Sequence, residues 1–538
     1  MSALFLVLIS IVIFFIAYVT YGAWLSKQWG VDTGRKTPAH TMSDGVDYVP
    51  AKAPVLLGHH FASIAGAGPI VGPIAAAIFG WIPVMLWIIF GGIFFGGVQD
   101  FGSLFASIRH DGKSIGQVIE ANIGKTGKKL FAVFAWLTLL LVVAAFVNIV
   151  ANTFVSVPAA ASSSLLFILL AVAFGFLVYR RGVPLAIGTV IGVGLLFLCI
   201  YLGIKFPISL SKNTWIFIIL GYIFIASVTP VWILLQPRDY LNSFLLYAMI
   251  GGAVIGLVLY NPSIQLASYS GFKVGNSFMF PMLFVTVACG AISGFHSLVG
   301  SGTSSKQIDN EKDAKLIGYG GMLIECVLAV IALITAAYIG GDKLQELLAN
   351  GGPVNVFSDG VGVFMTKIGI DFAVGKSFVA LAISAFALTS LDTATRLARF
   401  IFQEFFEDET KEEQSPLATN RYLSTMITVI LGGGLALMGW RKVWPLFGSA
   451  NQLLAALALL ALAAWLKNQG KNNVMFLIPM AFMFLVTLSA LGIIIYNSIK
   501  SANVILLVFG VLLFVLAIIL ISQSRKVLWG EGDTEKVK

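Results

Sequence analysis

The chain is organised as long apolar segments separated by short polar ones. Each apolar segment has about 18 or more residues, which as a helix can cross a hydrocarbon core of about 30 Å. The pattern therefore predicts an all-α polytopic membrane protein with about fifteen transmembrane helices. The predicted spans are 2–24, 55–79, 81–108, 129–152, 163–180, 183–203, 214–235, 240–260, 277–303, 315–340, 374–401, 420–440, 446–466, 473–496 and 502–522.

The charged residues predict how the chain sits in the membrane. With the N-terminus outside and the C-terminus in the cytoplasm, 25 of the 34 lysines and arginines fall in cytoplasmic loops, as the positive-inside rule requires. The pair Arg441–Lys442 falls outside, against this rule. A re-entrant segment at residues 443–452 is therefore kept as an alternative to a full span. We expect the cytoplasmic (inner) membrane of a bacterium. The net charge of +9 follows from topology and does not indicate a nucleic-acid partner.

Composition excludes an ordinary soluble enzyme. The chain is 58% hydrophobic and only 11% charged, whereas a soluble domain is roughly 25% charged. Three cysteines lie inside apolar spans with no pairing pattern, so neither a disulfide framework nor a metal site is expected. No nucleophile motif, zinc motif or phosphate-binding loop is present. We therefore predict that the protein is not an enzyme and has no cofactor.

The second span contains a concentration of helix-breaking residues. Two prolines and three glycines fall within residues 66–73, and proline removes a backbone donor and clashes with the preceding turn. Unwound backbone at membrane depth is tolerated where it is buried in protein or lines a cavity. We predict two half-helices here, with Gly66, Ala67 and Gly68 in a substrate site. A packing kink is the alternative for any single proline.

The seventh span is predicted to break in the same way. Thr229 and Pro230 form a good helix start, with a hydroxyl cap before a proline at the first helical position. Ser227 and Thr229 are therefore placed in the substrate site, where two positive helix N-termini suit a carboxylate. The second and seventh spans enter from opposite faces. Spans two to six and seven to eleven thus predict an inverted 5+5 repeat, a pattern of many secondary transporters.

Ionisable residues inside the spans are costly in lipid and indicate function. His59 and His60 precede the first break, and adjacent helical residues point about 100° apart, so at most one is expected to face a cavity. Histidine can carry a coupling proton near neutral pH. Asp100, Glu325 and Asp392 are further candidates for proton or ion coupling. The alternative for each is a structural role, as a hydrogen-bonded histidine or half of a buried pair.

The ninth span ends in a run of small hydroxyl residues. Ser293, His296 and Thr303 are predicted to line the substrate site from this span. The run is not a Walker loop, because a glycine should directly precede the lysine. The coupling ion is expected to be H⁺ or Na⁺, with no bound metal.

Six segments together resemble the carbon starvation protein A family. They are Gly58–Pro73 (GHHFASIAGAGPIVGP), Gly96–Phe101 (GGVQDF), Gln236–Leu241 (QPRDYL), Ser293–Gln307 (SGFHSLVGSGTSSKQ), Thr389–Arg399 (TSLDTATRLAR) and Phe447–Leu453 (FGSANQL). The resemblance implies a cation-coupled transporter related to the amino acid–polyamine–organocation group, with its LeuT/APC-like inverted-repeat core. It also implies uptake of pyruvate or of peptides, both of which carry a carboxylate.

The sequence therefore predicts three regions and one principal function. We expect a peripheral helix and cytoplasmic loop at 1–54, a ten-helix transport core at 55–401, and an acidic loop with four helices at 402–538. The function favoured is uptake of a small carboxylate such as pyruvate, driven by a proton or cation gradient. Uptake of di- or oligopeptides is the alternative, and a channel, a sensor or a membrane enzyme is less favoured. The expected partners are this substrate and the lipid bilayer; the oligomeric state stays open.

Overall fold

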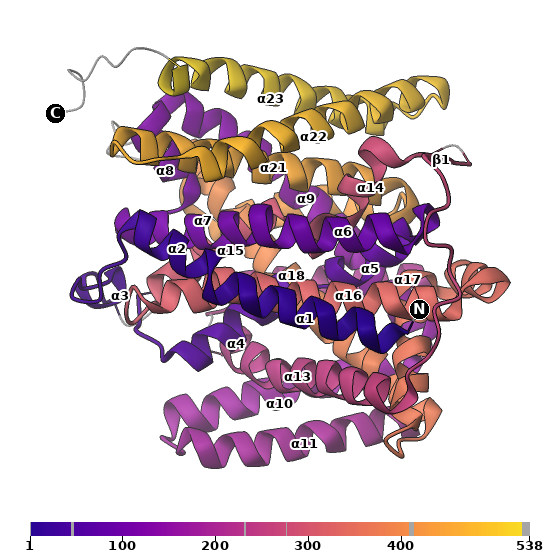
Figure 1. Cartoon of the computed structure of the whole chain (residues 1–538). Coiled ribbons are helices and arrows are strands. Elements are labelled where there is room, and N and C mark those ends of the chain that lie inside the picture. Colours follow the sequence, from indigo (N-terminus) through magenta and orange to yellow (C-terminus); the bar gives the residue numbers. More distant parts are fainter. Residues whose placement is uncertain (1, 45–47, 231–232, 276, 408–413, 530–538) are drawn as a thin grey trace.

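The protein folds into a bundle of helices long enough to cross a membrane. The computed structural model describes residues 2–44, 48–230, 233–275, 277–407 and 414–529. In these residues twelve helices have the length and hydropathy of a membrane span, or thirteen with one bent pair. In Figure 1 the helices lie roughly side by side, from α11 at the bottom of the view to α23 at the top. Helices α3 and α8 lie at the left, and the start of α1 lies at the right. The predicted all-α membrane fold is confirmed.

Groups of longer helices alternate with groups of shorter ones along the chain. The longer ones are α1 (Ala3–Val19), α9 (Lys125–Ser156), α10 (Pro158–Gly175), α11 (Leu185–Lys205), α12 (Lys212–Val228), α13 (Leu235–Tyr260), α16 (Gly321–Ile339), α17 (Gly341–Thr366), α18 (Phe372–Phe406), α20 (Arg421–Ala436), α21 (Trp440–Asn468), α22 (Val474–Lys500) and α23 (Val504–Trp529). The shorter ones are α2 (Tyr21–Trp29), α3 (Pro38–Thr41), α4 (Ala53–Ile64), α5 (Gly68–Ala76), α6 (Trp81–Gly91), α7 (Gly97–Arg109), α8 (Ile115–Ile123), α14 (Met279–Val287), α15 (Gly294–Gly302) and α19 (Pro416–Thr419).

Other elements modify or connect these helices. Short 3₁₀ turns are η1 (Ala77–Phe79), η4 (Ala288–Gly290) and η5 (Ser304–Lys306). Single π-helical turns are η2 (Gly92–Gly96), η3 (Phe176–Arg180) and η6 (Lys315–Gly320). The strands β1 (Lys273–Val274) and β2 (Ser277–Phe278) pair antiparallel, with Lys273 opposite Phe278.

The number of spans differs from the expected fifteen. Two of the expected spans coincide with helices that are short for a bilayer, α12 with 17 residues and α20 with 16. The expected number is therefore not confirmed. In contrast, α21 is one continuous helix that includes residues 443–452. The re-entrant alternative for this segment is wrong, because the helix continues unbroken through it with Pro445 inside.

The predicted break in the second span is confirmed. Helix α4 ends at Ile64, α5 begins at Gly68, and the two are bent by 46°. The Ser63 carbonyl, freed by the break, accepts a hydrogen bond from Ser390 Oγ at 3.0 Å. At Gly66 a Cβ would lie 2.6 Å from Ser390 Oγ and 2.7 Å from Phe146 Cε1, so the turn needs glycine.

The second break lies in the ninth span and not in the seventh. Helix α12 ends at Val228, Thr229 has extended backbone angles, and the next helix begins at Leu235 as α13. The residue before a proline is driven away from helical angles, so Thr229-Pro230 ends a helix where we expected it to begin one. The ninth span is instead interrupted between α14 and α15, over residues 288–293.

The interrupted helices lie against each other beside two very long helices. Helix α5 packs against α14 and η4, and a Cβ on Gly72 would lie 2.7 Å from the Thr286 carbonyl oxygen. Helices α9 and α18, of 32 and 35 residues, pack together along the centre of the bundle. Helix α21 packs against α9 and α15. Residues beyond 401 therefore contribute to the centre of the protein.

Candidate functional site

A cavity of ≈ 250 Å³ opens on the face that carries the loops around Tyr48, Lys113 and Lys306. Of the predicted site residues, His59 and Thr303 line it. The rest of the lining includes Lys113, Ser114, Gln117, Ser301, Lys306, Gln307, Thr393, Arg396 and Glu404. Three of these side chains are cations and one is a carboxylate, so the wall favours an anionic solute.

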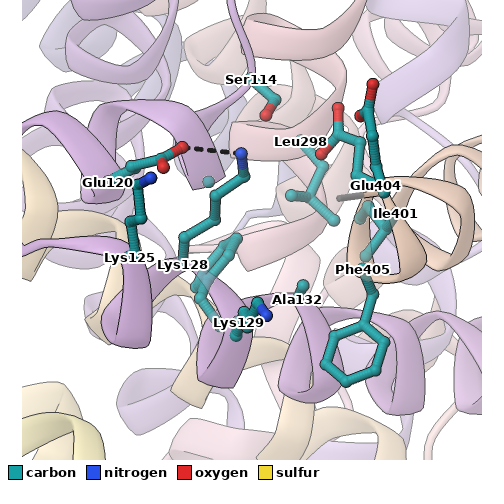
Figure 2. Close-up of a pocket in the computed structure, with 13 residues that line it drawn as sticks. Ser114, Glu120, Lys125, Lys128, Lys129, Ala132, Leu298, Ile401, Glu404 and Phe405 are labelled. Atoms are coloured by element: carbon teal, nitrogen blue, oxygen red, sulfur yellow. Dashed lines mark ion pairs between the residues drawn. The ribbon is translucent and has the colours of Figure 1, made fainter. Parts of the chain in front are cut away.

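A second cavity of ≈ 140 Å³ adjoins the first, and the two share Ser114, Leu298, Ile401 and Glu404. Figure 2 shows lysines at the start of α9 on one wall and Glu404 on the other. Lys128 Nζ lies 2.6 Å from Glu120 Oε2. The smaller cavity therefore has both lysine and glutamate side chains in its wall.

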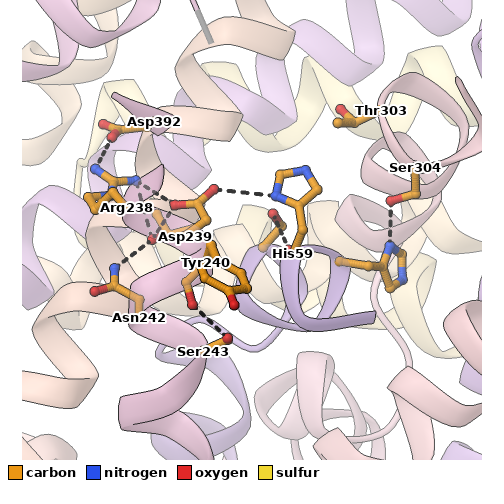
Figure 3. Close-up of polar contacts among 12 residues, drawn as sticks. His59, Arg238, Asp239, Tyr240, Asn242, Ser243, Thr303, Ser304 and Asp392 are labelled. Atoms are coloured by element: carbon orange, nitrogen blue, oxygen red, sulfur yellow. Dashed lines mark hydrogen bonds and ion pairs between the residues drawn. The ribbon is translucent and has the colours of Figure 1, made fainter. Parts of the chain in front are cut away.

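His59 connects the cavity to a buried cluster of charges. Its side chain is 13% exposed, and its Nδ1 lies 3.7 Å from Asp239 Oδ2 (Figure 3). No hydrogen bond joins the two atoms among the described residues. The histidine comes from the second half of α4 and the aspartate from the second turn of α13. His59 therefore lies between the cavity and the buried carboxylate of Asp239.

Arg238 holds the carboxylates of this cluster together. Its Nη1 donates to Asp392 and to the Tyr222 hydroxyl, and its Nη2 lies 3.1 Å from Asp239 Oδ1. Thr389 Oγ1 donates to the same Asp239 oxygen at 3.0 Å. Figure 3 shows these contacts joining α13 to α18. We call Arg238, Asp239, Asp392 and His59 the cavity cluster.

His60 points to the other side of α4. It is fully buried, and its Nδ1 is hydrogen-bonded to Ser304 Oγ at 2.7 Å. It does not line the cavity, whereas its neighbour His59 does. The structure thus places the two histidines on different faces, as the rotation of about 100° per residue requires.

A second group of ionisable residues is sealed inside the protein. His296 Nδ1 lies 2.8 Å from Asp100 Oδ2, and His296 Nε2 lies 3.5 Å from Glu325 Oε2. All three side chains are 0% exposed. They come from α15, α7 and α16. We call these three residues the sealed cluster.

Amide side chains complete the break between α14 and α15. Asn451 Oδ1 accepts from the Phe295 N–H at 2.9 Å, and Gln452 Nε2 donates to the Phe284 carbonyl at 2.7 Å. Gln99 Nε2 donates to the Ser293 carbonyl at 2.9 Å. Sequence reasoning gave these amides no role, although they lie in the motifs FGSANQL and GGVQDF. They satisfy backbone groups that an unwound helix leaves unpaired.

The other predicted substrate residues do not line the cavity. Gly66, Ala67 and Gly68 are buried at the tightly packed first break. The carbonyls of Ser227 and Thr229 accept hydrogen bonds from Arg399 and Arg396, at 2.9 and 2.6 Å. The seventh span therefore contributes a capped helix end, because cationic side chains satisfy the last carbonyls of α12.

Comparison with known proteins identifies the family. Residues 2–347 and 341–490 match the family described as carbon starvation protein CstA. The peptide transporter CstA of Escherichia coli is 34% identical over 567 residues, covering 91% of this chain and 80% of that protein. The pyruvate/proton symporter BtsT of the same species is 31% identical over 592 residues, covering 92% and 82%. The peptide transporter CstA of Bacillus subtilis is 31% identical, covering 90% and 89%.

A solved structure shares the fold. The manganese transporter of Eremococcus coleocola superposes with a TM-score of 0.52 at 14% identity, covering 90% of this chain and 99% of that one. At this low sequence identity, the likeness shows a shared fold and nothing about function. The family match and the curated relatives go further, and the chain belongs to the carbon starvation protein CstA family of membrane transporters.

Proposed function

We propose that the chain takes up a small carboxylate such as pyruvate across the bacterial cytoplasmic membrane, driven by protons. One observation carries the proposal: His59 stands in the wall of a cation-lined cavity and faces Asp239. Relatives named for peptide transport and for pyruvate/proton symport support the substrate class. The positive wall of the cavity supports an anion.

Coupling is proposed to occur at the cavity cluster. Protonated His59 pairs with Asp239, and this brings the charge of the cluster to zero. When the proton leaves, Asp239 remains bound through its other oxygen by Arg238 and Thr389. His59 lies on α4 and Asp239 on α13. Formation or loss of the ion pair between them can therefore shift the packing of the two helices between two arrangements.

Alternating access is proposed to use the two interrupted helices. We assign one half of the transporter to α4–α13 and the other to α14–α21, so that each half contains one interrupted helix. The second half then starts later than the sequence suggested. Helix α7 packs against α15, and α16 packs against α5. Each half thus covers the interrupted helix of the other, as expected for halves that rock around a central site.

Peptide uptake is the second candidate. The specific observation in its favour is Glu404, which faces lysines across the smaller cavity (Figure 2). A peptide has a free ammonium group that can lie against a carboxylate, and pyruvate has none.

We propose that the cavity face is cytoplasmic, with the N-terminus outside and the C-terminus inside, because lysine-rich loops surround it.

The test is uptake of labelled pyruvate by purified protein in liposomes, with and without an imposed inward proton gradient. Accumulation that needs the gradient is the expected result. Labelled di- and tripeptides are measured in parallel vesicles. Peptide accumulation without pyruvate accumulation would replace the substrate and leave the coupling site in place, whereas equal pyruvate flux with and without the gradient would contradict coupling.

A further inference from the structure

The sealed cluster has more negative than positive charge available. With His296 protonated, its one positive charge faces two carboxylates, Asp100 and Glu325. Its ion pairs among the described residues include no lysine or arginine. A buried carboxylate without a counter-charge is strongly disfavoured, so such a group takes up a cation. One further positive charge is needed for neutrality.

Glu325 is where that charge is missing. Both of its carboxylate oxygens are buried and lack a hydrogen-bond partner among the described residues. Asp100 has the His296 hydrogen bond at 2.8 Å, so it is the better satisfied of the two acids. The other titratable groups nearby are Cys326, next along α16, and His60 on α4, whose Cδ2 lies near Gly321. Neither supplies a permanent positive charge.

The cavity cluster is also short by one positive charge. Arg238 faces two carboxylates, Asp239 and Asp392, and His59 is the group that can add a proton. Further along α18, Arg396 and Arg399 donate to carbonyls at the end of α12. Among the described residues, no ion pair or hydrogen bond joins the two clusters.

We propose that each cluster binds one transported proton, so that two protons accompany each substrate, the second on the Glu325 carboxylate. This inference rests on the proposed function. Two protons and one monocarboxylate anion carry a net charge of +1 inward. Transport of pyruvate is then electrogenic, whereas coupling through the cavity cluster alone would be electroneutral.

Liposomes with equal pH on both sides test this directly. A tenfold outward potassium gradient with valinomycin sets an inside-negative potential, in sodium-free buffer. A net charge of +1 predicts accumulation of labelled pyruvate by about tenfold at equilibrium, since one charge falling through about 60 mV corresponds to a factor of ten. An imposed pH gradient in separate vesicles shows whether the protein transports at all.

The Glu325→Gln variant assigns the second proton. Glutamine keeps the shape of the side chain but cannot release or take up a proton, so pH-driven uptake should remain while potential-driven uptake is lost. Glu346→Gln, on the exposed surface of α17, is the matched control and should keep both.

The outcomes separate the two proposals. Wild-type uptake that responds to the pH gradient but not to the potential overturns the second proton and leaves the proposed function standing. Potential-driven uptake that needs sodium overturns the proton assignment at Glu325. No pyruvate or peptide uptake under either force overturns the proposed function itself. If Glu325→Gln does not fold, the wild-type measurement still decides the stoichiometry.

Discussion

The cavity cluster and the sealed cluster are two groups of buried ionisable residues that differ in their access to solvent. The cavity cluster has a partly exposed histidine at its edge and an arginine at its centre. The sealed cluster has neither exposure nor arginine. An arginine fixes two carboxylates permanently, because it does not lose its proton. Under the proposed mechanism, the cavity cluster exchanges one proton at its edge, whereas the sealed cluster needs a movement before it can exchange any.

The largest expected effect comes from removing the arginine. Arg238→Ala leaves Asp239 and Asp392 buried without their counter-charge, and breaking a buried pair costs about 3–5 kcal/mol. The free energy of unfolding, followed by denaturation of purified protein in detergent, should fall by that amount. Arg35→Ala is the control, since Arg35 is 51% exposed and 3.8 Å from Glu311, and it should cost less than about 1 kcal/mol. Equal losses in the two variants would show that Arg238 does not hold the cluster.

The next effect separates the two histidines of α4. His59→Gln should reduce proton-driven accumulation of substrate by at least about tenfold, because the imidazole that can take up a proton at the cavity wall is gone. His60→Gln should retain coupling, since His60 is hydrogen-bonded to Ser304 away from the cavity. Uptake is measured as a function of external pH for both variants. A wild-type pH dependence in His59→Gln would remove the cavity cluster from the coupling step.

A smaller effect is expected at the second break. Asn451→Ala leaves the Phe295 N–H without its acceptor, and an unsatisfied buried donor costs about 1–3 kcal/mol. The midpoint of thermal unfolding in detergent measures it. Gly434→Ala is a helical control with open space around the added carbon and should be neutral or slightly stabilising. A variant as stable as wild type would mean that the interruption does not depend on α21.

The smallest effect is expected at the edge of the smaller cavity. Lys128 pairs with Glu120, and their side chains are 21% and 26% exposed. Such pairs contribute about 0–1 kcal/mol. Lys128→Gln should therefore change the free energy of unfolding by less than about 1 kcal/mol, and less again at high salt. A loss as large as that of Arg238→Ala would show that stability depends on the cavity wall as much as on the buried cluster.

Local sequence signals predicted the first break and misplaced the second. Gly66–Pro73 combines prolines and glycines in one short segment, and these act on the backbone within a few residues. The interruption between α14 and α15 depends instead on Asn451, Gln452 and Gln99, which lie far away in the sequence. A break held by distant amides has no local signature.

The membership of the clusters could not be predicted either. Asp100, Glu325 and Asp392 were identified because charges are costly in spans, but their partners follow from how α7, α15, α16 and α18 pack. Arg238 lies within the motif QPRDYL, and the structure shows that it joins two carboxylates, Asp239 and Asp392. Which of the predicted site residues line the cavity, namely His59 and Thr303, follows from the packed structure and not from the sequence.

The most direct test of coupling is the proton movement that substrate itself produces. Protein is placed in liposomes with a pH-sensitive dye inside, without any imposed gradient, and pyruvate is added outside. The account predicts acidification of the lumen with the wild type and a much smaller acidification with His59→Gln. Entry of labelled pyruvate into wild-type vesicles without acidification would contradict proton coupling at the cavity cluster.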